Sequence, residues 1–334
     1  MIGDPWNSSL RIFQVSLVST NGLSRFTLHF SFVIPYCMGM RVLIVGCGYV
    51  GLPLGIELVR QGHEVFGLRR SVTGADELKR VGIHPLRADI TRPEELQQLP
   101  CDFDWVVNCT ASGGGGPDEY RQIYLEGNRN LIAWLAGSPL KKFIYTSSTS
   151  VYGQNDGSLV TESSPTQPEA ETAKVLVETE RLLLAAAQQG FPAAILRVAG
   201  IYGPARGHSF KTFLRGEARI EGEGARFLNM IHRDDLVGVI IAALQQAAPE
   251  DIFNAVDDEP VSQLNFFEWI AAELDRPLPP RTTADAEAGR KRGLTSKRVG
   301  NARLHQELGY TFRYPDFRAG YRGIIADWRL ATAD

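Results

Sequence analysis

Short apolar runs alternate along this chain with stretches in which apolar residues recur every three or four positions. The runs are rich in β-branched and aromatic residues, which predicts buried strands. The predicted strands are residues 41–45, 63–68, 83–88, 103–109, 142–147 and 193–197. The clearest predicted helices are residues 118–135 and 171–189. Strands that alternate with helices predict an α/β fold with a doubly wound parallel sheet and a ligand site at the carboxyl edge of that sheet.

A glycine-rich turn follows the first predicted strand. It reads Gly46-Cys47-Gly48-Tyr49-Val50-Gly51, and a helical pattern that ends near Gly62 comes directly after it. This is the GxGxxG fingerprint of dinucleotide-binding domains in its required strand–turn–helix context. The first glycine permits the tight turn, the second lets the backbone approach the pyrophosphate, and the third lets the helix pack on the strand. We therefore expect these six residues to bind a dinucleotide, with the helix N-terminus facing its phosphates.

The end of the second predicted strand indicates which dinucleotide is bound. An NAD site usually carries Asp or Glu there for the ribose hydroxyls, whereas this chain carries Arg69 and Arg70. Guanidinium groups can form bidentate bonds with a 2′-phosphate. The sequence therefore favours NADP over NAD, and the alternative is that one or both arginines only solvate the end of the strand.

Composition narrows the class of protein. The 334 residues include 35 Lys+Arg and 38 Asp+Glu, which give a formal net charge of −3, and 44% of the residues are hydrophobic. These values are ordinary for a globular protein and create no general attraction to nucleic acid or anionic lipid. The four cysteines form no CxxC pair, so we expect no metal site. Free thiols fit a reducing compartment. We expect a cytoplasmic protein with a small-molecule substrate and no nucleic-acid or membrane partner, and the sequence leaves the oligomeric state open.

The first forty residues differ from the rest of the chain. They carry few charges, and their longest apolar patch contains His29, Ser31 and Pro35. That patch is too short and too polar to span a bilayer, which takes about 20 residues. We expect residues 1–39 to form an extension outside the fold, and an export or anchoring signal is the alternative.

Several later segments resemble one family. They are FIYTSSTSVYG at residues 143–153, LRVAGIYGP at 196–204, NMIHRDDL at 229–236 and IFNAVDDEP at 252–260. Together with the glycine loop, these segments resemble the extended short-chain dehydrogenase/reductases, the NAD-dependent epimerase/dehydratase family. The resemblance runs from Met40 to about Pro260.

The resemblance implies two structural parts. The first is a Rossmann domain that binds NAD(P) over residues 40–205, to which residues 230–260 return. The second is a smaller C-terminal substrate lobe made of residues 206–229 and 261–334.

The same resemblance implies roles for particular residues. It places the catalytic hydroxyl at Ser148, the ribose-binding lysine at Lys174 and the adenine contacts at Asp89 and Ile90. The catalytic tyrosine of the family lies four positions before the lysine, where this chain has Ala170. Because alanine has no proton to give, the chain most resembles the atypical branch that lacks this tyrosine.

Other polar residues could take part in a reaction. Tyr152 is the nearest phenol that could replace the missing acid, although the family has a tyrosine there even when its usual catalytic tyrosine is present. The family asparagine of the helix after the fourth strand is also missing, and Tyr124 lies near its place. Arg206, His208 and Lys211 follow the Tyr-Gly-Pro turn and could meet an anionic substrate such as a nucleotide-sugar phosphate, or they could lie in a solvated loop.

The sequence therefore predicts an NAD(P)-dependent oxidoreductase or epimerase-like enzyme that acts on a small polar carbonyl or carbohydrate, with Ser148 polarising the carbonyl. The alternative is a non-catalytic NADP-binding protein that senses redox state or scaffolds a partner. Ala170 favours this alternative, whereas Lys174, Ser148 and the glycine loop favour an enzyme.

Overall fold

A computed structural model describes residues 39–71, 73–282 and 295–331. Residues 1–38, which make up nearly all of the predicted N-terminal extension, lie outside the described residues. None of the helices within the described ranges combines the length and the apolar character that a membrane crossing requires.

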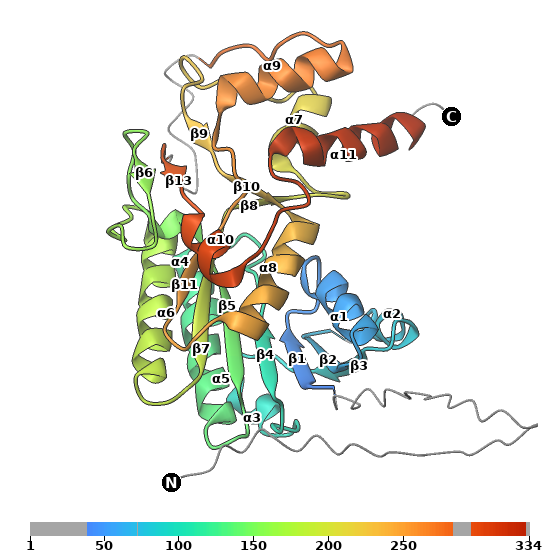
Figure 1. Ribbon diagram of the computed structural model, residues 1–334, viewed down its shortest axis with the longest axis vertical. Coiled ribbons are helices and arrows are strands. Elements are labelled where there is room, and N and C mark those ends of the chain that lie inside the picture. Colours follow the sequence, from blue (N-terminus) through green and yellow to red (C-terminus); the bar gives the residue numbers. More distant parts are fainter. Residues whose placement is uncertain (1–38, 72, 283–294, 332–334) are drawn as a thin grey trace, which may run out of the picture. The chain divides into compact units, whose positions relative to one another are not determined.

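A sheet of seven parallel strands forms the centre of the structure, in the order β11-β7-β5-β4-β1-β2-β3 (Figure 1). Its strands are β1 Arg41–Val45, β2 Glu64–Arg69, β3 His84–Arg87, β4 Trp105–Asn108, β5 Lys142–Ser148, β7 Ala193–Val198 and β11 Ile252–Ala255. The strand order reverses between β1 and β4, and the ligand crevice of a doubly wound sheet lies at such a switch point. The predicted fold class is confirmed.

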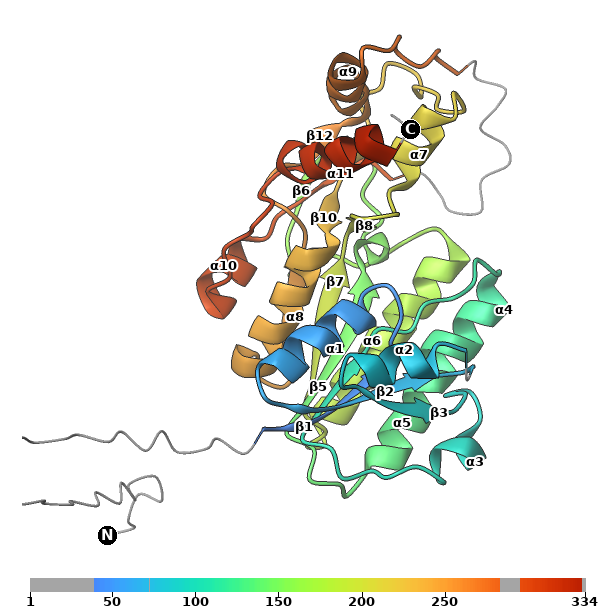
Figure 2. The same cartoon turned by 90° about the vertical axis from the view of Figure 1, so that its right-hand side faces the viewer.

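Alternate residues of β1 contact different layers of helices. Val42 and Ile44 belong to a core that also contains side chains of α1 and α8, whereas Leu43 and Val45 pack with side chains of α5 and α6. These helices are α1 Gly51–Arg60, α5 Gly127–Leu135, α6 Glu171–Ala187 and α8 Arg233–Gln246. The helices α1 and α8 pack side by side (Figure 2). The sheet is therefore covered on both faces, as the continuous apolar runs of its strands require.

Shorter elements complete the described chain. The remaining helices are α2 Ala75–Arg80, α3 Pro93–Leu96, α4 Pro117–Tyr120, the π-helix η1 Arg121–Glu126, the 3-10 helix η2 Thr149–Val151, α7 His208–Leu214, α9 Gln263–Leu274, α10 Ala302–Leu308 and α11 Phe317–Ala331. The remaining strands are β6 Leu159–Val160, β8 Gly200–Tyr202, β9 Phe227–Leu228, β10 Met230–His232, β12 Val261–Ser262 and β13 Arg298–Val299, and they pair in twos outside the main sheet.

The helices α7, α9 and α11 lie close together (Figure 1). Side chains from all three form a further hydrophobic cluster, whose aromatic residues include Phe210 of α7, Phe266 of α9, and Phe317 and Tyr321 of α11. The helix α10 instead packs against α8 and β11 of the sheet layer. The boundaries between the two predicted domains stay a prediction.

The helix after β4 differs from the single helix predicted over residues 118–135. It divides into α4, η1 and α5, with a π-helical segment in the middle. The Asn128 side chain donates to the carbonyl of Tyr124 at 2.7 Å and accepts from the side chain of Asn108 at 3.0 Å. A side-chain bond to a helix carbonyl competes with the ordinary backbone ladder, and single π turns often accompany functional sites.

A buried ion pair joins β7 to α6. Arg197 Nη2 lies 2.8 Å from Glu180 Oε2, and the two side chains are only 5% and 3% exposed. Ser147 Oγ of β5 donates to Glu180 Oε1 at 2.6 Å, and Arg197 Nη1 donates to the Tyr152 hydroxyl at 2.9 Å. These bonds satisfy the buried charges and connect three neighbouring elements beneath the carboxyl edge of the sheet.

We predict that Glu180→Gln lowers the free energy of unfolding by about 3–5 kcal/mol, because it leaves Arg197 as an uncompensated buried charge. Urea unfolding followed by circular dichroism measures this loss.

Glu178→Gln is the matched control on the same helix. Glu178 pairs with Arg121 at 2.8 Å, but its side chain is 41% exposed, so the loss should stay below about 1 kcal/mol. If both variants lost the same free energy of unfolding, burial would not make the Arg197–Glu180 pair more stabilising than an exposed pair.

Candidate functional site

Each glycine of the loop after β1 has a different environment. Gly46 has a φ of 81°, and a Cβ there would lie 2.8 Å from the backbone nitrogen of Thr110. A Cβ on Gly51 would lie 2.7 Å from the carbonyl oxygen of Gly46. A Cβ on Gly48 would meet only that same oxygen, at 3.9 Å. The first and third glycines are thus required by packing, whereas the second leaves an open surface that a ligand can approach.

The helix α1 begins directly at this open surface. Its N-cap residue, Val50, provides no side-chain cap. The first amides of a helix generally lack partners within the helix and carry a positive partial charge. The amide of Leu52 donates to the carbonyl of Gly48 at 2.8 Å, and the amides that precede it can bind phosphate oxygens. The loop follows β1, and Gly46 lies close to Thr110 just after β4, so the loop is at the switch point between these two strands. These residues fit the diphosphate of a dinucleotide.

The two arginines at the end of β2 occupy different environments. Arg69 Nε donates to the carbonyl of Cys47 in the glycine loop at 2.6 Å, and its guanidinium pairs with Glu77 of α2 at 3.2 Å. Arg70 is exposed, and its carbonyl accepts from Arg87 Nε at 3.4 Å. The sequence assigned the same role to both residues. In the structure Arg69 is bonded to the glycine loop, whereas the side chain of Arg70 is exposed.

The residues predicted to contact adenine lie just beyond β3. The Asp89 carboxylate accepts from the amide of Thr91 at 2.9 Å and from its hydroxyl at 2.8 Å. Ile90 is buried, and a Cβ on Gly127 would lie 2.6 Å from its Cδ1. Both residues stay predicted adenine contacts.

The predicted catalytic residues lie on two elements. Ser148 ends β5, pairs in register with Val198 of β7, and accepts from the amide of Ser150 at 3.2 Å. Lys174 lies in the first turn of α6, where its Nζ is 2.7 Å from Glu171 Oε1 and both side chains are largely exposed. Ala170 is the N-cap residue of α6, with an extended ψ of 128°. Ser148 therefore lies at the carboxyl edge of the sheet. The roles of Ser148 and Lys174 stay predictions.

Tyr152 lies in the buried framework. Its side chain is 0% exposed, and its hydroxyl donates to Asn254 Oδ1 at 2.8 Å while accepting from Arg197. Burial raises the pKa of this phenol despite the neighbouring guanidinium. This geometry argues against the acid/base role considered for Tyr152, because the proton is committed to a protein partner and a buried phenol ionises less readily.

Residues 112–117 form a glycine-rich segment, SGGGGP, which follows β4 and is bonded to the helix after it. The amide of Ser112 donates to the Tyr124 hydroxyl at 3.1 Å, and the amide of Gly113 donates to Glu119 Oε1 at 3.0 Å. Tyr124 belongs to the π-helical segment. The sequence signal for this contact was weak, because it consisted only of a tyrosine near the place of a family asparagine.

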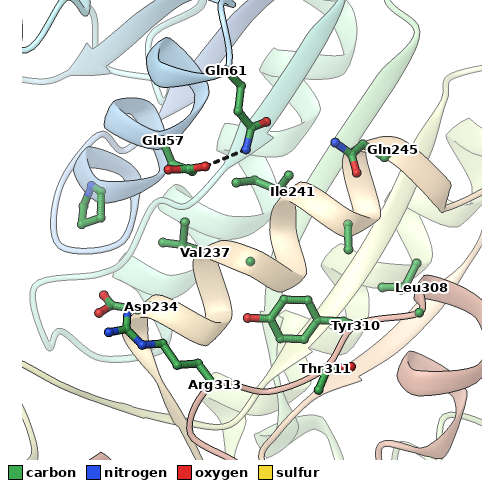
Figure 3. A pocket seen from close by; sticks show the side chains of 14 residues that line it. Glu57, Gln61, Asp234, Val237, Ile241, Gln245, Leu308, Tyr310, Thr311 and Arg313 are labelled. Atoms are coloured by element: carbon green, nitrogen blue, oxygen red, sulfur yellow. Dashed lines mark hydrogen bonds between the residues drawn. The ribbon is translucent and has the colours of Figure 1, made fainter.

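A separate pocket of about 680 Å³ lies between α1, α8 and the segment after α10 (Figure 3). Its lining includes Glu57 and Gln61 of α1, Val237 and Ile241 of α8, and Tyr310. It contains none of the residues predicted from the sequence to bind cofactor or substrate. The described residues also hold no cluster of three or more His, Cys, Asp or Glu side chains suited to a metal ion.

Comparisons with known proteins agree with this geometry. The model of the NAD dependent epimerase/dehydratase family matches residues 42–255. Protein YeeZ of Escherichia coli (strain K12) is 30% identical over 281 residues, which cover 83% of this chain and 97% of that protein. A 3-diazoavenalumate denitrifying reductase of a Streptomyces species is 28% identical over 309 residues, which cover 84% of this chain and 99% of that protein.

A solved structure from Methylobacillus flagellatus, assigned to the NAD-dependent epimerase/dehydratases, has a TM-score of 0.70 and 33% identity to this chain. The match covers 87% of this chain and 99% of that chain. The glycine loop, the strand order and these relatives lead to one conclusion: this chain belongs to the NAD-dependent epimerase/dehydratase family.

Proposed function

We propose that this chain is an NADP-dependent oxidoreductase that acts on a small polar carbonyl or carbohydrate. The observation that carries the proposal is the open backbone at Gly48 beside the uncapped start of α1, with the exposed Arg70 at the end of the adjacent strand. Family membership supports a dinucleotide in this place, and the Streptomyces relative is named as a reductase.

Arg70 is the residue that supports NADP over NAD. The guanidinium of Arg69 already bonds to Cys47 and Glu77, so a 2′-phosphate would have to compete with those partners. Arg70 lies on the same strand end and is exposed, and an arginine can bind a phosphate through two parallel bonds. Arg70 would therefore bind the 2′-phosphate, whereas Arg69 would hold the glycine loop in shape.

Ser148 and Lys174 would act at the nicotinamide end of the cofactor. The bound nicotinamide supplies hydride chemistry. The Ser148 oxygen accepts from the Ser150 amide, which leaves its own hydrogen for a bond to a substrate oxygen. Among the residues that the structure describes, Lys174 pairs with the exposed Glu171 alone. Since an exposed ion pair contributes about 0–1 kcal/mol, Lys174 can turn to a ribose hydroxyl at little cost.

A non-catalytic NADP-binding protein is the second candidate. It is favoured by Ala170, which stands at the N-cap of α6 where the family carries its phenol, and by the buried hydroxyl of Tyr152. Such a protein would sense redox state or scaffold a partner through the same glycine loop.

Arg70→Ala should weaken NADP binding by about tenfold to a hundredfold and leave NAD binding nearly unchanged, because a charge-assisted phosphate contact contributes about 1.5–3 kcal/mol. Arg69→Ala should weaken both dinucleotides, because it releases the glycine loop that they share. Isothermal titration calorimetry of the parent and both variants measures the dissociation constants of NADP and NAD. Tighter binding of NAD than NADP by the parent would refute the NADP assignment.

Ser148→Ala should lower kcat by about 10²–10³-fold and leave NADP affinity unchanged, because a hydrogen bond to the developing oxyanion acts mainly in the transition state. The measurement is NADPH oxidation against a panel of carbonyl compounds and sugar nucleotides. If no member of the panel turns over while NADP binds tightly, the non-catalytic candidate is favoured.

Tyr152→Phe should lower the free energy of unfolding by about 1–3 kcal/mol, because it removes a partner from the buried Arg197 and Asn254 side chains. Its effect on kcat should stay small at temperatures where the variant is folded. A fall in kcat of about 10²–10⁴-fold with unchanged stability would instead identify Tyr152 as the general acid. Thermal unfolding and the same kinetic assay separate these results.

A further inference from the structure

The side chain of Tyr49 connects the glycine loop to the segment after β8. Its hydroxyl donates to the carbonyl of Pro204 at 3.0 Å. A Cβ on Gly203 would lie 2.9 Å from the Tyr49 hydroxyl and 3.1 Å from Cβ of Arg233. Gly203 also has a φ of 149°, which side chains rarely tolerate. Only glycine therefore lets this segment approach the ring so closely.

Two guanidinium groups lie over the same ring. Cζ of Arg206 is 4.9 Å from the ring centroid of Tyr49, and Cζ of Arg233 is 5.3 Å from it. Cation–π contacts of this kind contribute about 0.5–1 kcal/mol each at exposed sites. Tyr49 therefore holds two positive charges beside the loop that binds the dinucleotide.

Of these two charges, Arg233 alone has a carboxylate partner among the described residues. Arg233 pairs with Asp234 at 2.8 Å. Arg206 is exposed, and within the described ranges it forms no ion pair. Because like charges held near one another repel, the cluster of Tyr49, Arg206 and Arg233 favours an anion beside it. The adjacent open face at Gly48 and the uncapped start of α1 favour an anion as well.

We propose that Arg206, seated on Tyr49 beside Arg233, binds the diphosphate of the dinucleotide together with the glycine loop. This assignment rests on the proposed function, since it requires a dinucleotide in that loop. It gives Arg206 a role toward the cofactor, in place of the anionic substrate considered from the sequence. It also means that the bound cofactor holds the segment from Pro204 to Arg206 against the Rossmann domain.

The test is a set of calorimetric titrations of the full chain with NADP, NAD and ADP-ribose. These three ligands share a diphosphate, and ADP-ribose lacks the nicotinamide. Arg206→Gln should weaken all three by about the same factor, roughly tenfold, because it removes a charge-assisted contact that they have in common. This pattern differs from that of Arg70→Ala, which should affect NADP alone.

Three variants control for charge and for the ring. Arg215→Gln removes the same charge from the end of α7, where Arg215 pairs with Glu217 at 2.8 Å, and it should change no affinity by more than about twofold. Tyr49→Leu removes the ring and should reproduce the loss seen in Arg206→Gln, whereas Tyr49→Phe keeps the ring and should lose much less. The double variant Tyr49→Leu/Arg206→Gln should lose little more than either single variant, because the two residues act together.

Two results would overturn the assignment while the proposed function stands. One is tight dinucleotide binding by the parent with all three affinities unchanged in Arg206→Gln. The other is a loss confined to an added sugar nucleotide, UDP-glucose, which would place the bound anion on the substrate. If the parent binds none of the three ligands, the proposed function fails and this assignment fails with it.

Discussion

The geometry of the sheet edge depends on the buried ion pair between Arg197 and Glu180. Removing two charges from water costs several kcal/mol per ion unless every neighbouring group is well placed. Ser147 and Tyr152 supply the additional bonds, so β5, β7 and α6 are fixed relative to one another. Ser148 directly follows this arrangement. Its position beside Val198 is therefore held by the pairing of β5 with β7 and, one residue away, by this buried network.

The sequence predicted the parts of the fold that depend on local pattern. The first strand was predicted at its observed bounds, Arg41–Val45, because a continuous apolar run before GxGxxG leaves little choice of register. The π-helical segment was not predicted. It accompanies a bond between Asn108 and Asn128, which lie in different elements, and no helical period encodes such a contact. Hydrophobic spacing shows that a helix exists, but it does not show where a polar side chain interrupts the backbone ladder.

The candidate site was likewise predicted only in part. The glycine loop could be recognised because the motif gives each glycine a separate reason, and close contacts at Gly46 and Gly51 bear out two of them. The different environments of Arg69 and Arg70 could not be recognised, since they depend on the bonds of Arg69 to the carbonyl of Cys47 and the carboxylate of Glu77. The role of Tyr152 could not be recognised either. A tyrosine near a sheet edge looks the same in the sequence whether its hydroxyl faces a ligand or, as here, Asn254. Motifs report which residues are present, whereas burial and partner choice decide what those residues can do.

The extended backbone of Ala170 has a consequence for any side chain placed at that position. A phenol four residues before Lys174 shares a helical face with it only when both residues lie within the helix. Ala170 precedes the helix, with a ψ of 128°, so a tyrosine placed there would leave the backbone in a different direction. A tyrosine at position 170 would therefore lie four residues before Lys174 in the sequence without lying one helical turn from it in space. Engineering such a pair on this scaffold would also require α6 to begin earlier, so the start of a helix, as well as a side chain, sets which groups can meet at this edge of the sheet.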